Sequence, residues 1–182
     1  MRVLRSLLIV ATVTAVVVFY NWYAFDRLIQ SDLAKDHRNE KVSVHVYSKW
    51  AIRPDHLVFD VWGIDGEASM ADVSRTFFIS AASLKDWHFK WVTLAYLGQA
   101  RFVMDGDDFR ALGREYDGGQ NPGHLIRTWP EKLQTPDGQR AYGSWTGGLL
   151  GVLGKQMEDL SDMHRRWYLD DIARKWAGQS KP

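Results

Sequence analysis

The feature that most constrains this chain is an uncharged stretch of twenty residues near its N-terminus, residues 6–25. It contains the apolar runs 7–10 and 16–19 and lies between Arg5 and Asp26. At a rise of about 1.5 Å per residue, a helix of this length is about 30 Å long and matches the hydrocarbon core of a bilayer. The sequence therefore predicts a single-pass transmembrane helix over residues 6–25, with the lipid bilayer as its partner.

A cleaved signal peptide is the alternative interpretation of this stretch, because Arg2 and Arg5 place positive charge ahead of an apolar segment. However, residues 21–25 lack a pair of small residues at the spacing of a cleavage site. Trp22 and Tyr23 are typical of the aromatic residues found at the membrane–water interface beside a retained helix. We therefore expect a signal-anchor that stays attached to the chain, so that residues 1–25 form a membrane anchor.

The orientation of the anchor is predicted from its flanking charges, which are nearly balanced. The basic residues are Arg2 and Arg5 before it and Arg27, Lys35, Arg38 and Lys41 after it, where Asp26 and Asp32 slightly reduce the positive charge. We expect the N-terminus in the cytoplasm, because the opposite orientation requires a short tail with two arginines to cross the bilayer. The domain is then predicted on the periplasmic or extracellular side, in the cell envelope.

Composition limits the rest of the chain to one domain and excludes several kinds of chemistry. About 155 residues follow the anchor, which suits a single core, and 46% of the chain is hydrophobic. The absence of cysteine excludes disulfides, thiolate nucleophiles and Cys-ligated zinc. Nucleic acid is not expected as a partner, because 23 basic residues are balanced by 22 acidic ones without a basic cluster.

Periodicity predicts an α+β domain over residues 42–177, preceded by an amphipathic collar and linker over residues 26–41 and followed by a tail over residues 178–182. Alternating apolar residues predict strands over residues 42–47 and 56–62. The two strands are expected to pair antiparallel.

A helix, a hairpin and another helix are predicted next. Apolar residues recur every three or four positions over residues 70–84, directly after the capping residue Ser69. Strands over residues 89–97 and 100–104 are separated by Gly98-Gln99, which predicts a two-residue turn with the glycine first. A short helix then follows over residues 107–116, where acidic residues suit a helix N-terminus.

The last third of the chain is predicted to be a loop and a long helix. Glycine and proline recur over residues 117–148, so we expect an ordered loop that apolar side chains hold on the core. A long C-terminal helix is predicted over residues 149–176. Taken together, the elements predict a roughly four-stranded antiparallel sheet covered on one face by helices.

No motif identifies a reaction, so neither a catalytic residue, a cofactor nor a metal is expected. The glycine-rich run before Lys155 does not have the spacing of a phosphate-binding loop. The interpretation that we favour is that Gly148, Gly151 and Gly154 let another backbone approach the C-terminal helix closely.

The first functional hypothesis is a membrane-tethered, noncatalytic interaction or assembly module. Its partner is expected to be another envelope protein, bound by the glycine- and proline-rich loop. The residues assigned to this surface are Gln120, Asn121, Arg127, Trp129 and Trp145.

The alternative is an envelope enzyme or glycan-binding protein that uses Glu115, Glu158, Asp162 or His164 beside exposed aromatic residues. Glu158 and Asp162 are one helical turn apart, so both carboxylates are able to face one metal ion. We favour ordinary ion pairs between residues four positions apart on a solvated helix face.

Overall fold

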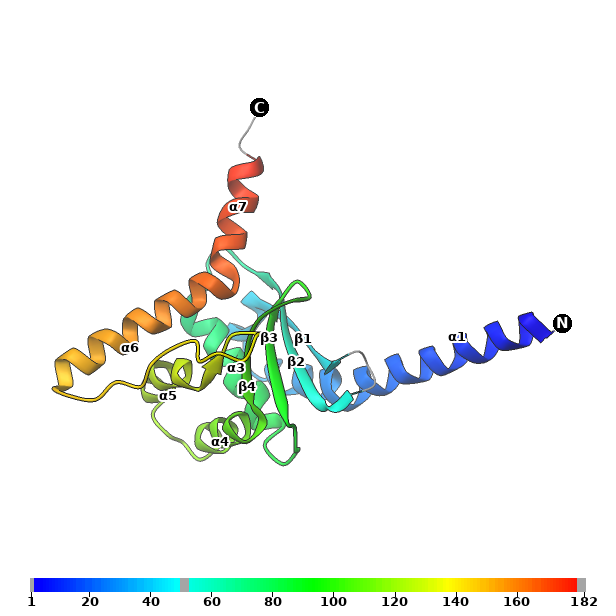
Figure 1. Cartoon of the computed structure of the whole chain (residues 1–182), viewed down its shortest axis with the longest axis horizontal. Helices are drawn as coiled ribbons and strands as arrows, with labels where there is room; N and C mark the ends of the chain where they lie inside the picture. The colour runs from blue at the N-terminus through cyan, green and yellow to red at the C-terminus, as the bar shows by residue number, and fades with distance from the viewer. Residues whose placement is uncertain (1, 50–52, 180–182) are drawn as a thin grey trace.

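The computed structural model describes residues 2–49 and 53–179, and its centre is a mixed five-stranded sheet (Figure 1). In spatial order the strands are β1 (Val42–Lys49), β2 (Arg53–Ile64), β3 (Trp91–Tyr96), β4 (Gln99–Asp105) and β5 (Leu133–Gln134). β2 and β3 are parallel, whereas the other neighbouring pairs are antiparallel. The α+β class is confirmed, but the four-stranded antiparallel sheet is wrong in strand number and direction. Residues 180–182 of the expected tail lie outside the described residues.

The parallel pair follows from the helix that joins its strands. α3 (Met70–Ser83) packs on the sheet and returns the chain to the end at which β2 began, so β3 runs in the same direction. Its N-terminus is the predicted one. The Ser69 hydroxyl accepts a hydrogen bond from the Asp72 amide at 3.2 Å, and the Asp72 carboxylate accepts one from the Ser69 amide at 2.8 Å.

The turn between β3 and β4 is shifted by one residue from the predicted one. Tyr96 pairs with Gln99, so the two turn residues are Leu97 and Gly98, with φ angles of 49° and 77°. Glycine is therefore second in a turn in which both residues have positive φ. The Asp60 carboxylate accepts hydrogen bonds from the Gly98 amide at 3.0 and 3.1 Å, which holds the turn against β2.

The predicted loop is ordered and supplies the fifth strand. After α4 (Gly106–Asp117), it contains α5 (Pro122–Thr128), a 3-10 turn over Trp129–Lys132 and β5, which pairs with β4. Leu125, Trp129 and Leu133 are fully buried. A strand of only two residues is too short to show an alternating pattern, which is why the sequence did not reveal it.

The C-terminal helix is confirmed as a long helical path in three parts. α6 (Leu149–His164) continues through a π-helical turn over Arg165–Leu169 into α7 (Asp170–Gln179). In Figure 1 the free end of α6 and the C-terminal part of α7 project from the body of the domain.

The N-terminal part of the chain is also one helical path that leads into the core. It consists of α1 (Arg2–Asn21), a π-helical turn over Trp22–Asp26, α2 (Arg27–Leu33) and a 3-10 turn over His37–Lys41. α1 projects from the domain (Figure 1), whereas Phe25, Ile29 and Leu33 are buried. Within the described residues, the structure holds no helix of sufficient length and apolar character to cross a membrane.

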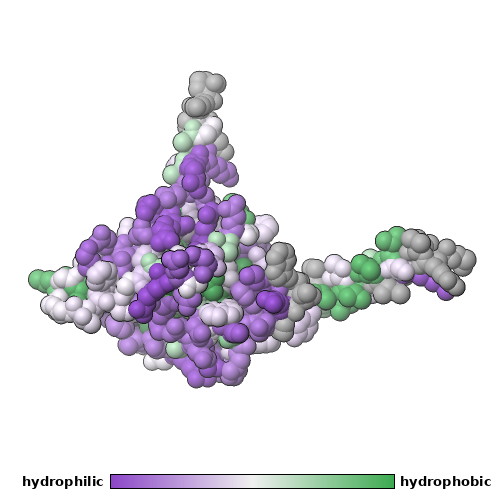
Figure 2. Space-filling view, viewed as in Figure 1, coloured by the Kyte–Doolittle hydropathy of each residue, from purple (hydrophilic) through white to green (hydrophobic). Residues whose placement is uncertain are grey.

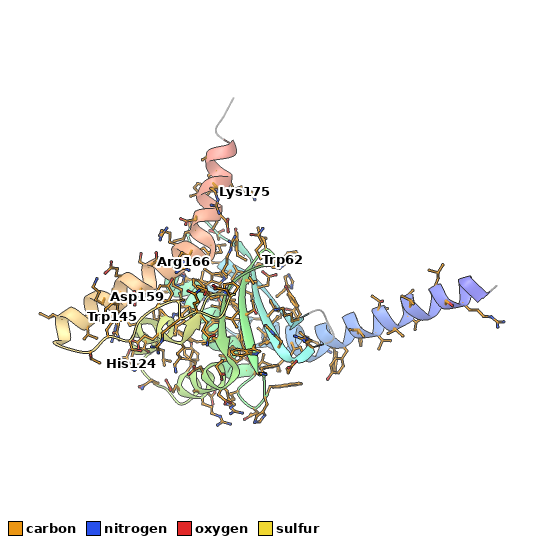
Figure 3. All side chains as sticks on the ribbon, in the orientation of Figure 1. Trp62, His124, Trp145, Asp159, Arg166 and Lys175 are labelled. Carbon is orange, nitrogen blue, oxygen red and sulfur yellow. The ribbon has the colours of Figure 1, made fainter. Side chains whose placement is uncertain are left out.

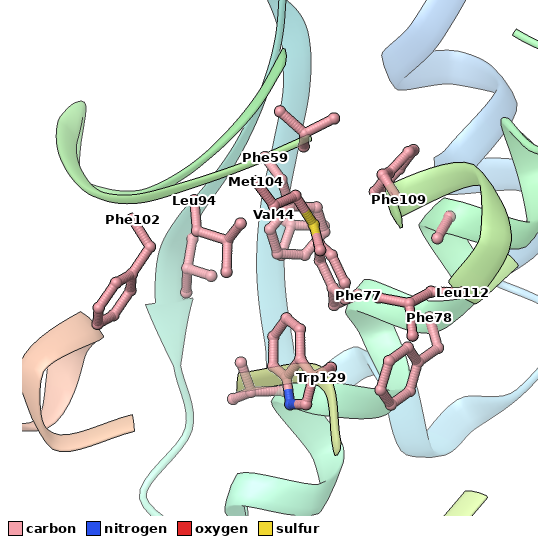
Figure 4. Packing of buried hydrophobic residues seen from close by; sticks show 14 of the residues in the cluster. Val44, Phe59, Phe77, Phe78, Leu94, Phe102, Met104, Phe109, Leu112 and Trp129 are labelled. Carbon is pink, nitrogen blue, oxygen red and sulfur yellow. The ribbon is translucent and has the colours of Figure 1, made fainter. Parts of the chain in front are cut away.

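Aromatic side chains fill the space between the sheet and the helices (Figure 4). The Phe77 ring of α3 lies 4.4 Å from the Trp129 ring and 5.2 Å from the Phe59 ring of β2, measured between centroids. Phe109 of α4 lies 5.6 Å from the Phe77 ring, so one side chain joins the sheet, two helices and the loop. Burying each such side chain contributes about 1.5–3 kcal/mol.

α3 and α4 approach closely at Gly113. A Cβ atom at this position would lie 2.2 Å from the Ala81 carbonyl oxygen, which belongs to the backbone and has no room to rotate away. The close contact between the two helices therefore requires glycine at this position.

We expect Gly113→Ala to lower the free energy of unfolding by about 1–3 kcal/mol, because the helices must separate to accept the methyl group. Chemical denaturation of the full chain in detergent, followed by tryptophan fluorescence, measures the change. Gly154→Ala is the matched control. A methyl group at this position would meet no atom within 4 Å, so this variant is expected to be neutral or slightly stabilising. Equal effects of the two substitutions would contradict the packing argument.

Candidate functional site

The first half of α6 presents apolar side chains to solvent. The exposed fractions are 84% for Leu150, 37% for Leu153 and 46% for Met157, and these three residues are called the α6 patch below. Figure 2 shows the hydrophobic surface at the free end of this helix. In the second half of the same helical stripe, Leu160 and Met163 are buried. The apolar face therefore continues beyond the part of the domain that covers it.

The glycines beside the α6 patch do not have the expected role within this chain. For Gly148, Gly151 and Gly154, a Cβ atom would meet no atom within 4 Å, apart from the neighbours and the backbone of the helix itself. The expectation that they admit a close backbone is therefore wrong for this chain among the described residues. The reason is that the segment extends past the domain, where no second element reaches it.

The loop before α6 is held against the helix by carboxylates. Trp145 donates from Nε1 to the Asp159 carboxylate at 2.6 Å, and the Tyr142 hydroxyl donates to the Asp162 carboxylate at 3.1 Å. Figure 3 shows Trp145 and Asp159 together beside α6. The ammonium of Lys155 lies 5.7 Å from the centre of the Trp145 ring. The two aspartates are three positions apart on α6, so they fix two aromatic residues on one side of the helix.

Asp162 is the centre of a charged group rather than a free carboxylate. Arg165 donates a hydrogen bond to it, and an Arg166 guanidinium nitrogen lies 3.6 Å from it. Burial raises the pKa of Asp162, but the hydrogen bonds from Arg165 and Tyr142 outweigh burial, so its pKa lies below the ordinary value. Burial and the Asp162 charge raise the pKa of Tyr142.

The five residues assigned to the partner surface are not all accessible. Gln120 is exposed, and Trp145 is 37% exposed. The Asn121 side chain caps α5 by accepting hydrogen bonds from the Gly123 and His124 amides. Arg127 is half-buried, and Trp129 is fully buried in the aromatic core.

The four residues of the alternative site do not converge on one cleft. Glu115 is exposed on α4, and Glu158 is exposed on α6, where Lys155 donates a hydrogen bond to it at 2.7 Å. His164, in contrast, is fully buried. Among the described residues, no group of three or more histidine or acidic side chains has the geometry of a metal site.

His164 is enclosed by the aromatic core. Its Nε2 atom lies 3.2 Å from the Ser74 hydroxyl, which itself donates to the Met70 carbonyl. Nε2 is therefore the protonated nitrogen, and Nδ1 is buried without a hydrogen-bond partner among the described residues. Burial lowers the pKa of His164 to about 3. The side chain is therefore neutral at ordinary pH, and it is packed in the core rather than placed in an accessible site.

The sequence did not single out the α6 patch. Its residues belong to an apolar stripe that has the same period over its whole length, and only the structure shows where the cover ends. A local signal was the set of glycines in the same segment, since glycine is unfavourable in the interior of a helix and its repetition there is unusual.

Comparison with known proteins finds no match to this chain among family models, curated sequences or solved structures.

His164 is expected to make the protein less stable in mild acid. Its pKa in the folded chain lies below the unfolded value of about 6.5, so the unfolded chain binds a proton that the folded chain excludes. Its contribution to stability is fully present above pH 6.5 and decreases as the pH falls towards 3. Between pH 7 and pH 5 we expect a loss of about 2 kcal/mol.

The measurement is urea denaturation at pH 7 and pH 5 for the native chain and for His164→Met. Burial also lowers the pKa of His56, but both proteins contain His56, so the difference between them isolates His164. If the two chains lose equal stability on acidification, the assignment of this pH dependence to His164 is wrong.

Proposed function

We propose that this protein is a noncatalytic interaction module that α1 tethers to a membrane and that binds a partner protein through the α6 patch. The observation that carries the proposal is the exposure of Leu150, Leu153 and Met157 on a helix whose later turns are buried. Contiguous exposed apolar side chains are unfavourable in water and mark interaction surfaces. An amphipathic helix that projects from a domain suits a partner with an apolar groove.

Trp145, in the loop before α6, extends this surface. Trp145 lies over the side of α6 through its hydrogen bond to Asp159, and tryptophan is among the residues that contribute most to binding energy at interfaces. Gln120 is exposed on a separate connection, between α4 and α5. Trp129 is excluded from the proposed surface because it is buried.

The membrane tether is supported by the character of α1. More than half of each of the following side chains is exposed: Leu7, Val10, Val13, Val16, Phe19 and Tyr20. Most of them are three positions apart, so each is rotated by about 60° from the last and together they surround the helix. A helix that is apolar on all sides is typical of a lipid environment rather than of water.

The proposed localisation is a single-pass membrane protein with its N-terminus in the cytoplasm and its domain on the periplasmic or extracellular side. This assignment rests on the short, arginine-containing N-terminal tail. The proposed partner is accordingly another protein of the cell envelope.

The tether is tested by charge in the middle of α1. The native chain is expected to stay in the membrane fraction after alkaline carbonate extraction, and Val13→Lys with Val16→Lys is expected to release it. Each lysine at the centre of a membrane helix costs about 2.5–3.5 kcal/mol. Val13→Leu with Val16→Leu is the matched control and should remain bound. Recovery of the native, uncleaved chain in solution without detergent would show that the tether is absent.

The α6 patch is tested by a photo-crosslinking amino acid in place of Leu153, in intact membranes. We expect a crosslinked adduct to a second protein there and none from the same amino acid at Glu115, an exposed residue of α4. Substitution of Leu150 and Met157 by glutamate should abolish the adduct while changing stability by only about 0.5 kcal/mol, because both side chains are exposed. Absence of any adduct from Leu153 would count against the patch as a partner surface.

A further inference from the structure

A groove of about 560 Å³ lies where α1 meets the domain. It is lined by Tyr20, Tyr23, Arg27, Leu28, Ser31 and Trp87. The first five residues belong to the continuous N-terminal helical path, whereas Trp87 follows α3 and is distant in the sequence. The fold has therefore brought a tryptophan to the point where the chain leaves α1.

Buried aromatic contacts fix the position of Trp87. The Trp87 ring packs edge-on against Phe25, with 5.0 Å between centroids, and lies nearly parallel to Phe89 at 6.4 Å. Phe25 and Phe89 are both buried in the core. The wall of the groove is thus part of the packed domain rather than a mobile loop.

Hydrogen bonds to β1 fix the other wall of the groove. The buried Asp26 carboxylate accepts a hydrogen bond from the Val46 amide at 3.2 Å, and the Gln30 amide donates to the Val44 carbonyl at 2.7 Å. The helical path cannot rotate on the sheet without breaking these bonds. An α1 inserted in lipid therefore places this groove at the membrane surface.

The groove has the chemistry of the lipid interface. Tyrosine and tryptophan favour the headgroup level of a bilayer, because their rings are apolar and their polar atoms remain hydrated. The guanidinium of Arg27 lies 5.2 Å from the centre of the Tyr23 ring, and Arg27 is exposed. Among the described carboxylates none forms an ion pair with Arg27, so its charge is available to a phosphate.

The neighbouring end of the sheet also carries exposed or half-buried cations. Lys49 ends β1, Arg53 begins β2, and Lys90 donates its backbone amide to the Asp55 carbonyl beside them. In Figure 1 this end of β1 and β2 lies beside the junction with α1. Asp55, Asp86 and Asp105 lie at the same end of the sheet, so the charge there is mixed and the phosphate contact is assigned to Arg27.

We propose that the groove holds the headgroup and glycerol region of a phospholipid from the bilayer that contains α1, with Arg27 binding the phosphate. The proposal rests on the proposed membrane tether and adds that the domain is seated on the lipid surface in one orientation. The occupant is a membrane lipid rather than free phosphate, because the aromatic lining continues the apolar surface of α1 through Tyr20.

The seating of the domain is tested by fluorescence quenching. The chain has no cysteine, so single cysteines carrying an environment-sensitive fluorophore can be introduced at Val10, His88 and Gln120. The full chain is placed in vesicles whose lipids carry a quencher at headgroup level or in the acyl chains. We expect quenching at Val10 by the acyl-chain quencher, quenching at His88 by the headgroup quencher, and none at Gln120.

The outcomes separate this inference from the tether. Quenching at Val10 with a His88 signal no different from that of Gln120 overturns the inference and leaves the tether intact. Absence of quenching at Val10 overturns the tether and this inference with it.

The phosphate contact is tested by lipid selectivity. Native mass spectrometry of the full chain from vesicles of equal phosphatidylglycerol and phosphatidylcholine counts the lipids that remain bound. Because a basic residue at an anionic lipid surface changes affinity about fivefold, Arg27→Gln should reduce the preference for phosphatidylglycerol by about this factor. Arg114→Gln, on exposed α4, is the matched control and should retain the native preference. Retention of the full preference by Arg27→Gln would overturn the role of Arg27.

Discussion

The burial of Phe77 is the interaction on which the rest of the structure depends. Its ring contacts Phe59 of the sheet, Phe109 of α4 and Trp129 of the ordered loop. These three neighbours come from strands, helices and loops that are far apart in the sequence. α3 is therefore more than a connection between β2 and β3, because its aromatic face is the surface on which the other elements assemble. The loop is ordered for the same reason, since the Trp129 side chain is buried in this aromatic cluster.

Local patterns in the sequence predicted those elements that local interactions determine. The cap at Ser69, the long C-terminal helix and the hairpin near Gly98 all follow from residues within a few positions of one another. The parallel pairing of β2 and β3 is a property of how α3 packs, and the two residues of β5 have no pattern of their own. The turn is also held by a hydrogen bond from the Gly98 amide to the Asp60 carboxylate, 38 positions away. Long-range contacts of this kind are absent from any short window of sequence.

The candidate site shows a second reason why sequence patterns do not determine the structure. The apolar stripe over α6 was evident, but a stripe indicates only that one face requires cover, whether from the same chain or from another molecule. Leu160 and Met163 receive that cover from the domain, whereas Leu150 and Leu153 do not. The two tryptophans assigned to the partner surface differ in the same respect, because tryptophan is suited to both a protein core and an interface. Trp129 is in the core, and Trp145 is near the surface.

The two projecting helices are connected through the rigid part of the molecule. α1 is joined to β1 through the buried Asp26, and α6 is joined to β3 through Trp167, whose Nε1 atom donates to the Ala95 carbonyl at 2.9 Å. Figure 1 shows the free ends of α1 and α6 on opposite sides of the domain. If α1 is inserted in a membrane, the α6 patch is consequently held away from the lipid. The apolar side chains of the patch cannot then be buried in the same bilayer. This geometry favours a protein over the membrane as the partner of α6, and it requires no flexible linker between the membrane and the partner.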